Sequence, residues 1–257
     1  RIAVARSRVG QPEVKIGIIP GAEGTQRLPR LIGIVAAAEL CASGRMVSAQ
    51  EGEKLGVIDA IVGDDLLSEA IQFALTKVKE NAPPRKTRDL HDMLQLNETA
   101  KLALEQLKQA VAKKARGMQA PLKAIEAVEI TADSTFRDGC LKEADIFDTC
   151  LRSDEAQGLM HVFFSERAVS KIPDIPIDTK PMKIERAAVI GAGTMGGGIT
   201  MSYVNAGIPV VLKEVEQAAL DRGLEIIRRN YAASVKRGKL SKEEAEKRIA
   251  LISPTLN

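Results

Sequence analysis

The chain has 257 residues, of which 45% are hydrophobic and 28% charged, and its formal charge is only +3. So small a charge gives no reason to expect nucleic acid or an anionic membrane surface as a partner, and without tryptophan the chain has few side chains for stacking bases. Three cysteines cannot all pair within the chain, and none lies at metal-ligand spacing from a histidine, so we expect a reducing compartment and no metal site. The sequence shows neither a secretory leader nor an apolar run of about 18 residues, so secretion and a membrane span are not expected.

Residues 1–62 alternate short apolar runs with a helical stretch, as α/β proteins do. We expect β-type runs at Ile2–Ala5 and Val14–Ile19, and an apolar strand at Val57–Val62. Between them, the alanine-rich segment Gly33–Cys41 predicts a helix that ends at Gly44.

The next stretch is predicted to be mostly helical. Ser48 followed by Glu51 indicates a capping box for a short helix, and residues 64–80 carry apolar residues at helical spacing. After a proline-bearing charged stretch, residues 97–169 show the apolar stripes of several helices. Stripes of this kind form cores far more often than they form sites.

A second α/β pattern begins after a proline-rich segment. The apolar run Ala187–Ile190 leads into a turn that contains Gly191, Gly193 and Gly196, and a helical segment follows. In such a unit the first glycine permits a tight turn, and the second lets backbone approach a pyrophosphate. The third lets the helix pack close to the sheet. The order strand, glycine turn, helix and strand predicts a dinucleotide-binding unit.

The polar groups of this unit indicate which dinucleotide is bound. The N–H groups of Ala192, Thr194 and Met195 lie at the positive end of the helix dipole, where an anion is favoured. Glu214 follows Gly191 by 23 residues, where a carboxylate can accept both ribose hydroxyls of an adenosine and repel a 2′-phosphate. This predicts NAD as cofactor, although the adjacent Lys213 weakens the argument against NADP.

The front of the chain resembles a known family. The stretch P-E-V-K-I-G-I-I-P-G-A-E-G-T-Q-R-L-P-R-L-I-G, with S-G-R-M-V-S-A-Q-E-G-E-K-L-G-V-I-D after it, is similar to the crotonase (enoyl-CoA hydratase/isomerase) family. The resemblance implies that Glu13 is one of two catalytic glutamates. It implies that the other glutamate and the two oxyanion-hole amides belong to segments before P-E-V. Glu23 departs from the glycine or small residue that the family often has there.

The rest of the chain resembles parts of multifunctional β-oxidation enzymes. S-D-E-A-Q-G-L-M-H-V-F-F-S-E-R is similar to their helical connection, and V-I-G-A-G-T-M-G-G-G-I with V-V-L-K-E is similar to the NAD-binding half of 3-hydroxyacyl-CoA dehydrogenases. The expected organisation is a partial crotonase module at 1–96, a helical connection at 97–170 that completes the hydratase module, a linker at 171–183, and the first half of a Rossmann NAD-binding domain at 184–257.

The resemblance implies an internal piece of an enzyme that hydrates enoyl-CoA and oxidises the 3-hydroxyacyl-CoA with NAD. It implies an acyl-CoA thioester as substrate, a thiolase subunit or a second copy of the chain as partner, and a bacterial cytoplasm or a peroxisomal matrix as compartment. Two alternatives remain open: a catalytically silent NAD- or CoA-binding module, and an unrelated NAD-dependent oxidoreductase whose front half only looks like crotonase.

Overall fold

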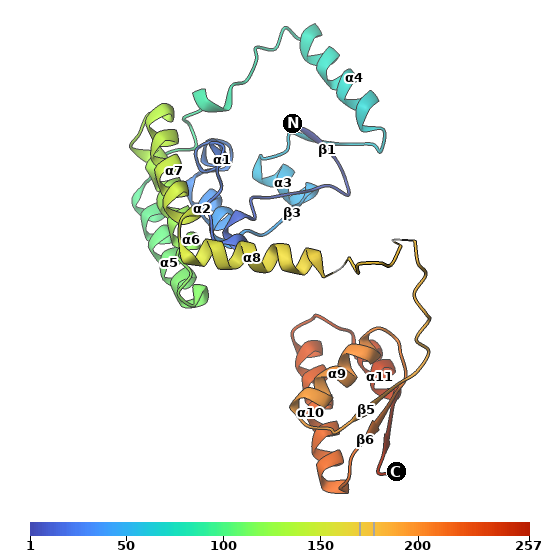
Figure 1. Cartoon of the computed structure of the whole chain (residues 1–257). Coiled ribbons are helices and arrows are strands. Elements are labelled where there is room, and N and C mark those ends of the chain that lie inside the picture. The colour runs from blue at the N-terminus through green and yellow to red at the C-terminus, as the bar shows by residue number, and fades with distance from the viewer. Residues whose placement is uncertain (170, 177) are drawn as a thin grey trace. The chain divides into compact units, whose positions relative to one another are not determined.

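The structure is a computed structural model that describes residues 1–169, 171–176 and 178–257 (Figure 1). The chain divides into two compact units, Arg1–Pro173 (unit 1) and Asp174–Asn257 (unit 2), and each is described by itself. The expected connection at 97–170 and linker at 171–183 each include one residue, Ser170 and Ile177, that lies outside the described residues.

Unit 1 combines short strands with a larger set of helices. Strand β1 pairs in parallel with β4, and β2 pairs antiparallel with β3. The strands are β1 (Ile2–Val4), β2 (Arg8–Val9), β3 (Val47–Ser48) and β4 (Ala60–Val62). The α-helices are α1 (Gly24–Ile32), α2 (Ile34–Ser43), α3 (Ala49–Leu55), α4 (Leu66–Lys79), α5 (Glu98–Ala115), α6 (Ala120–Glu129), α7 (Phe136–Leu151) and α8 (Asp154–Ala168). Short 3-10 turns lie at η1 (Glu13–Ile16), η2 (Thr87–Asp89) and η3 (Ile130–Ala132).

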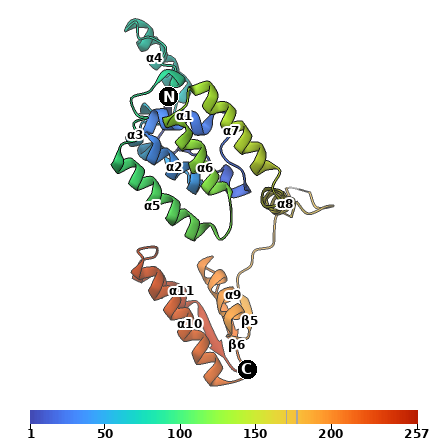
Figure 2. The same cartoon turned by 90° about the vertical axis from the view of Figure 1, so that its left-hand side faces the viewer.

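The core of unit 1 lies where α2 packs against α6, with α1, α5 and α7 around this pair (Figure 2). Ala37, Ala38 and Cys41 of α2 are fully buried in one apolar cluster with Ala124 and Val128 of α6. Small side chains at the contact let two helices approach closely, which buries apolar surface efficiently. This packing fixes α2, next to which the Glu13 segment lies.

The expected β-run at Val14–Ile19 is wrong. Residues Glu13–Ile16 form the 3-10 turn η1, and Gly17 ends it with a left-handed φ of 80°. The apolar residues suggested a strand because Val14 and Ile19 are both buried in the core. A short, fully buried apolar run has no period that distinguishes strand from turn or helix, so packing decides its conformation.

Helix α4 is confirmed, but its apolar face is not covered. Leu67, Ile71, Leu75 and Val78 are 73%, 50%, 48% and 71% exposed, and the helix has no buried residue. The apolar spacing therefore predicted the helix correctly, whereas the described residues provide no surface against which its face packs.

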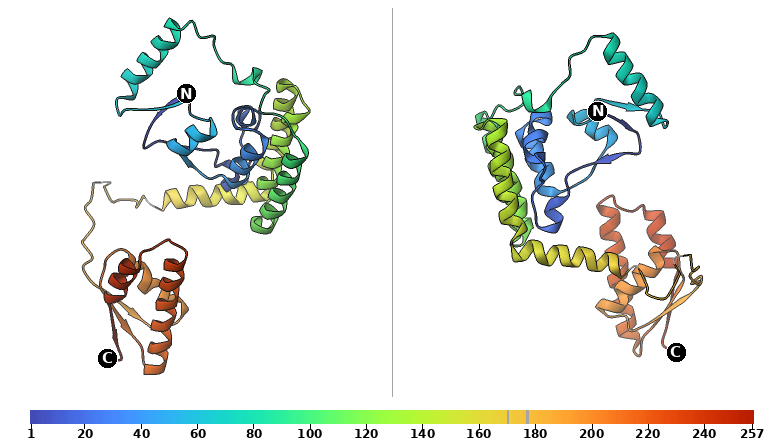
Figure 3. Two further views of the ribbon diagram at one scale, coloured as in Figure 1. Left: turned by 180° about the vertical axis from the view of Figure 1, so that it is seen from behind. Right: turned by 45° about the horizontal axis from the view of Figure 1, so that its top comes forward.

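Unit 2 is an α/β arrangement of the dinucleotide-binding type, in which three mutually contacting helices accompany a parallel sheet (Figure 3). Its parallel sheet has the order β5-β6-β7, formed by β5 (Ala187–Ile190), β6 (Val210–Lys213) and β7 (Ile252–Thr255). Its helices are α9 (Thr194–Asn205), α10 (Gln217–Lys236) and α11 (Lys242–Ala250). Leu212 of β6 and Ile227 of α10 are buried in one core, so the central strand and α10 hold the unit together.

Strand β5 has the bounds of the expected apolar run. Ser241 with Glu244 forms the capping box that starts α11, which continues to Ala250, and β7 follows at Ile252. Among the described residues, no helix combines the length and the apolar character that crossing a membrane requires.

Candidate functional sites

Glu13 lies at the edge of an apolar cavity in unit 1. It starts the turn η1, and the cavity beside it has a volume of about 490 Å³. Leu159, Val162 and Phe163 of α8 form most of its apolar lining, and Glu166 of the same helix also lines it. The Oε2 atom of Glu13 is buried and has no hydrogen-bond partner among the described residues. A buried carboxylate oxygen without a donor is costly and is therefore a candidate for chemistry.

Two contacts hold the segment around Glu13 in place. Val14 is buried in the core, and the Gln11 Oε1 atom lies 3.2 Å from the Cys41 thiol, which donates to it. A Cβ at Gly24 would overlap the Gln11 side chain, so the start of α1 packs directly on this segment. Burial raises the pKa of the Cys41 thiol, and the negative charge of Glu13 adds to the effect. Cys41 is thus a protonated structural thiol.

A buried carboxylate, Glu143 of α7, ties the start of α1 to the helical layer. Its oxygens accept hydrogen bonds from the backbone N–H of Glu23 (2.7 Å) and of Thr25 (2.9 Å), and from the Thr25 hydroxyl. Glu143 is 3% exposed, and burial raises its pKa although these hydrogen bonds act in the opposite direction. Glu23 itself has a left-handed φ of 66°. This explains how the chain accepts a glutamate where a small residue was expected, because Glu143 holds the Glu23 amide in position.

The glycine turn of unit 2 has the geometry that its sequence predicts. Gly191 has a φ of 95°, and its N–H donates to the Lys213 carbonyl at 2.7 Å. A Cβ at Gly196 would overlap the carbonyl oxygen of Gly191, so α9 packs directly against the turn. A Cβ at Gly193 would meet nothing within 4 Å. The turn is therefore tight on the side of the sheet and open at Gly193, where a pyrophosphate could approach the backbone.

Glu214 lies at the end of β6 beside this turn. Its Oε1 accepts from the Ala192 N–H at 2.7 Å, and its Oε2 accepts from the Val215 N–H at 3.0 Å. These two backbone hydrogen bonds lower its pKa, so the carboxylate is ionised. The Ala192 amide, which was expected to bind the anion, thus donates to Glu214 instead. The amides of Thr194 and Met195, in the first turn of α9, have no partner within their own helix and fit an anion.

One residue of this site was missed from the sequence. A Cβ at Gly223 of α10 would overlap Ala192, so α10 packs directly on the glycine turn. A glycine inside an otherwise helical pattern is unfavourable unless packing requires it, so the glycine at position 223 was the signal in the sequence.

The described residues contain no group of three or more His, Cys, Asp or Glu that could hold a metal ion.

A carboxylate beside an apolar cavity and a glycine turn on a parallel sheet are features of the class of α/β proteins that bind apolar ligands and dinucleotides. Comparison with known proteins makes this more specific. Residues 1–142 match the enoyl-CoA hydratase/isomerase family, which is more than half of the chain, so the chain belongs to that family. Residues 186–257 match the NAD binding domain of 3-hydroxyacyl-CoA dehydrogenase. The expected crotonase-like fold, the Rossmann half and NAD as cofactor are thereby confirmed.

Curated relatives come from plants, animals and bacteria. A glyoxysomal fatty acid beta-oxidation multifunctional protein of Brassica napus is 37% identical over 100% of the chain and 36% of its own length. A peroxisomal bifunctional enzyme of Danio rerio is 40% identical over 88% of the chain and 32% of its own length. The fatty acid oxidation complex subunit alpha of Idiomarina loihiensis is 34% identical over 100% of the chain and 36% of its own length. The chain thus spans only about a third of the length of these relatives.

Proposed function

We propose that the chain is part of a bifunctional fatty-acid β-oxidation enzyme. It would hydrate trans-2-enoyl-CoA and oxidise the resulting (3S)-3-hydroxyacyl-CoA with NAD. The observation that carries the proposal is the tandem of residues 1–142, of the hydratase family, with residues 186–257, of the dehydrogenase NAD-binding domain. The product of the first reaction is the substrate of the second, so one chain with both modules serves consecutive steps. The names of the relatives agree with this pairing.

Glu13 is the proposed acid–base residue of the hydration. In that reaction the oxygen of a water molecule bonds to the β-carbon of the enoyl thioester, one water proton goes to a base, and the α-carbon receives a proton. The unpartnered Oε2 of Glu13 can accept or return such a proton. One carboxylate cannot be acid and base at the same time, so a second group completes the transfer. The apolar residues of α8 beside Glu13 suit the hydrocarbon part of an acyl chain.

The glycine turn and Glu214 are the proposed NAD-binding residues. When bound, NAD supplies the hydride acceptor of the oxidation. Gly191 and Gly196 shape the turn, and Gly193 with the Thr194 and Met195 amides receives the pyrophosphate. The ionised Glu214 carboxylate accepts the ribose hydroxyls and disfavours a 2′-phosphate. These residues bind and orient the cofactor.

The proposed substrate is an acyl-CoA thioester, and the proposed compartment is a peroxisomal matrix or a bacterial cytoplasm. The compartment is suggested by the relatives, which include a peroxisomal enzyme of Danio rerio and a bacterial subunit. A thiolase subunit or a second copy of the chain is a proposed partner. Size-exclusion chromatography of the protein expressed from its full reading frame, with and without the thiolase encoded by the same genome, tests the partner.

The function is tested with two variants of the protein expressed from its full reading frame. Glu13→Gln should reduce the hydration of crotonyl-CoA by about 100-fold or more and leave the oxidation of 3-hydroxybutyryl-CoA unchanged. Glu214→Ala should weaken NAD binding and leave hydration unchanged. The proposal fails if Glu13→Gln hydrates at the wild-type rate, or if the wild-type protein oxidises no 3-hydroxyacyl-CoA in the presence of NAD.

A further inference from the structure

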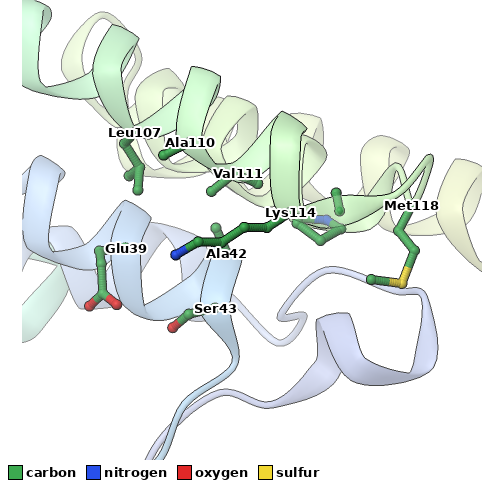
Figure 4. A pocket seen from close by; sticks show the side chains of 10 residues that line it. Glu39, Ala42, Ser43, Leu107, Ala110, Val111, Lys114 and Met118 are labelled. Carbon is green, nitrogen blue, oxygen red and sulfur yellow. The ribbon is translucent and has the colours of Figure 1, made fainter. Parts of the chain in front are cut away.

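A second cavity of unit 1 lies between α2 and α5 and shares no lining residue with the cavity of Glu13 (Figure 4). Its volume is about 390 Å³, within the range of about 300–1,000 Å³ that small-molecule sites usually have. Its apolar lining consists of aliphatic side chains: Ala42, Leu107, Ala110, Val111, Ala115, Met118 and Pro121. No aromatic ring lines it, so it offers no surface for stacking a base or another planar ring.

One cation spans this cavity. The Lys114 side chain runs across it, and its ammonium group points toward the α2 side, where Glu39 and Ser43 lie (Figure 4). Lys114 forms no ion pair with any described residue. Glu39 is already paired, because both of its carboxylate oxygens accept from Arg45 Nε at 3.0 and 3.1 Å. The Lys114 charge is thus the one in this lining that lacks a direct counter-ion among the described residues.

Two further basic residues are near Lys114 in sequence but are not part of the cavity lining. Lys113 and Arg116 flank Lys114 at the C-terminal end of α5. A single lysine provides a compact charge and suits a monovalent head group, whereas phosphate sites usually combine several donors or a planar arginine. A monovalent anion attached to an unbranched apolar chain matches both the charge and the aliphatic lining.

We propose that the α2–α5 cavity binds a straight-chain aliphatic carboxylate of medium length. Its methylenes would lie on Leu107 and Val111, and its carboxylate would bind the Lys114 ammonium. The cavity volume of about 390 Å³ accommodates a chain of about eight carbons. The site is separate from Glu13 and does not depend on the proposed function.

Octanoate is the probe for this site, titrated into the full chain. We expect saturable binding with a Kd of about 1 mM or below, seen by calorimetry and by a shift of the Met118 methyl signal in NMR spectra. Affinity should rise about threefold to fourfold for each methylene from butyrate to octanoate. Lys114→Met should weaken octanoate binding about tenfold and leave octanol binding unchanged. Lys113→Met, next to Lys114 but outside the lining, is the matched control and should bind octanoate as the wild type does.

A second variant separates this site from the Glu13 cavity. Ala110→Trp fills the α2–α5 cavity from an exposed position and should abolish octanoate binding while the thermal melt is retained. Leu159→Asp, in the lining of the Glu13 cavity, should leave the Met118 shift unchanged. The proposal is overturned if octanoate shows no saturable binding, or if Ala110→Trp binds octanoate normally and Leu159→Asp does not. Loss of hydration by Glu13→Gln has no bearing on either result.

Discussion

The glycine turn of unit 2 and the Glu13 cavity of unit 1 are built from very different lengths of chain. Residues 191–214 contain the glycines, the first turn of α9 and Glu214, and hydrogen bonds between neighbouring strands hold them together. The Glu13 cavity joins residues 12–16 to residues 159–166 of α8. The first site thus depends on backbone conformation within one β-α-β segment. The second depends on the packing of helices that are far apart in sequence.

This difference determines how each site should respond to substitution. In the glycine turn, the limiting quantity is the space between backbone segments, so adding one methyl group is enough to disrupt it. In unit 1, buried polar groups hold the Glu13 segment and the start of α1. The effect of a substitution there should therefore depend more on the hydrogen bonds and the protonation state of these groups than on side-chain volume. Four predictions test this contrast, from the largest expected effect to the smallest.

Gly196→Ala should destabilise unit 2 by about 3 kcal/mol, because its Cβ would overlap the carbonyl of Gly191 and the backbone cannot give way cheaply. Amide hydrogen exchange in the full chain should show lost protection in β5 and β6 and unchanged protection in α2. Gly198→Ala is the control, because its Cβ meets nothing within 4 Å. It should raise helix stability by up to about 1 kcal/mol. Equal effects of the two substitutions would disprove the steric explanation.

Glu214→Ala should weaken NAD binding to the full chain by about 10–100-fold, because it removes charge-assisted hydrogen bonds and releases the Ala192 amide. Discrimination against NADP should fall at the same time. Fluorescence titration with NADH and NADPH measures both effects. Glu216→Ala changes an exposed carboxylate two residues away, at the start of α10, and should alter neither affinity. If Glu216→Ala weakened NADH binding as strongly, the role assigned to Glu214 would be refuted.

Glu143 should make the stability of unit 1 fall as pH rises. Burial raises its pKa, so the folded protein binds this proton more tightly than the unfolded chain, where the value is near 4.5. Stability is then greatest below 4.5 and decreases as pH rises from 4.5 through the folded-state pKa. The decrease is about 1.4 kcal/mol for each unit by which the pKa is raised. Glu143→Gln should remove this slope in urea unfolding curves, whereas the control Glu126→Gln should keep it.

Glu13→Gln should have the smallest effect on folding, a gain of about 0.5–1 kcal/mol in unit 1, because it removes a charge whose Oε2 has no donor. Thermal melts of the full chain test this. Glu166→Gln, on an exposed carboxylate of the same cavity, should change stability by less than about 0.5 kcal/mol. A loss of more than about 1 kcal/mol for Glu13→Gln would indicate a structural role instead of a catalytic one.

Local interactions account for much of the secondary structure. The caps at Asn97, Ser153 and Ser241 start α5, α8 and α11, and each side chain accepts from a backbone N–H three residues later. The glycine spacing from Gly191 to Gly196 predicted the turn, because Gly191 has a left-handed φ and Gly196 leaves no room for a Cβ. These features depend on interactions within a few residues, so the sequence carries them directly. The cofactor-binding residues themselves remain a prediction.

By itself, the sequence determined the Rossmann half, the helical character of residues 97–169 and Glu13 as a catalytic candidate. Only the tertiary structure decided that residues 13–16 form a turn, that α8 lines the Glu13 cavity, and that Glu143 holds the start of α1. The physical reason is the range of the interactions. Caps and glycine turns are satisfied by near neighbours, whereas buried runs and buried carboxylates take their conformation and partners from segments more than a hundred residues away.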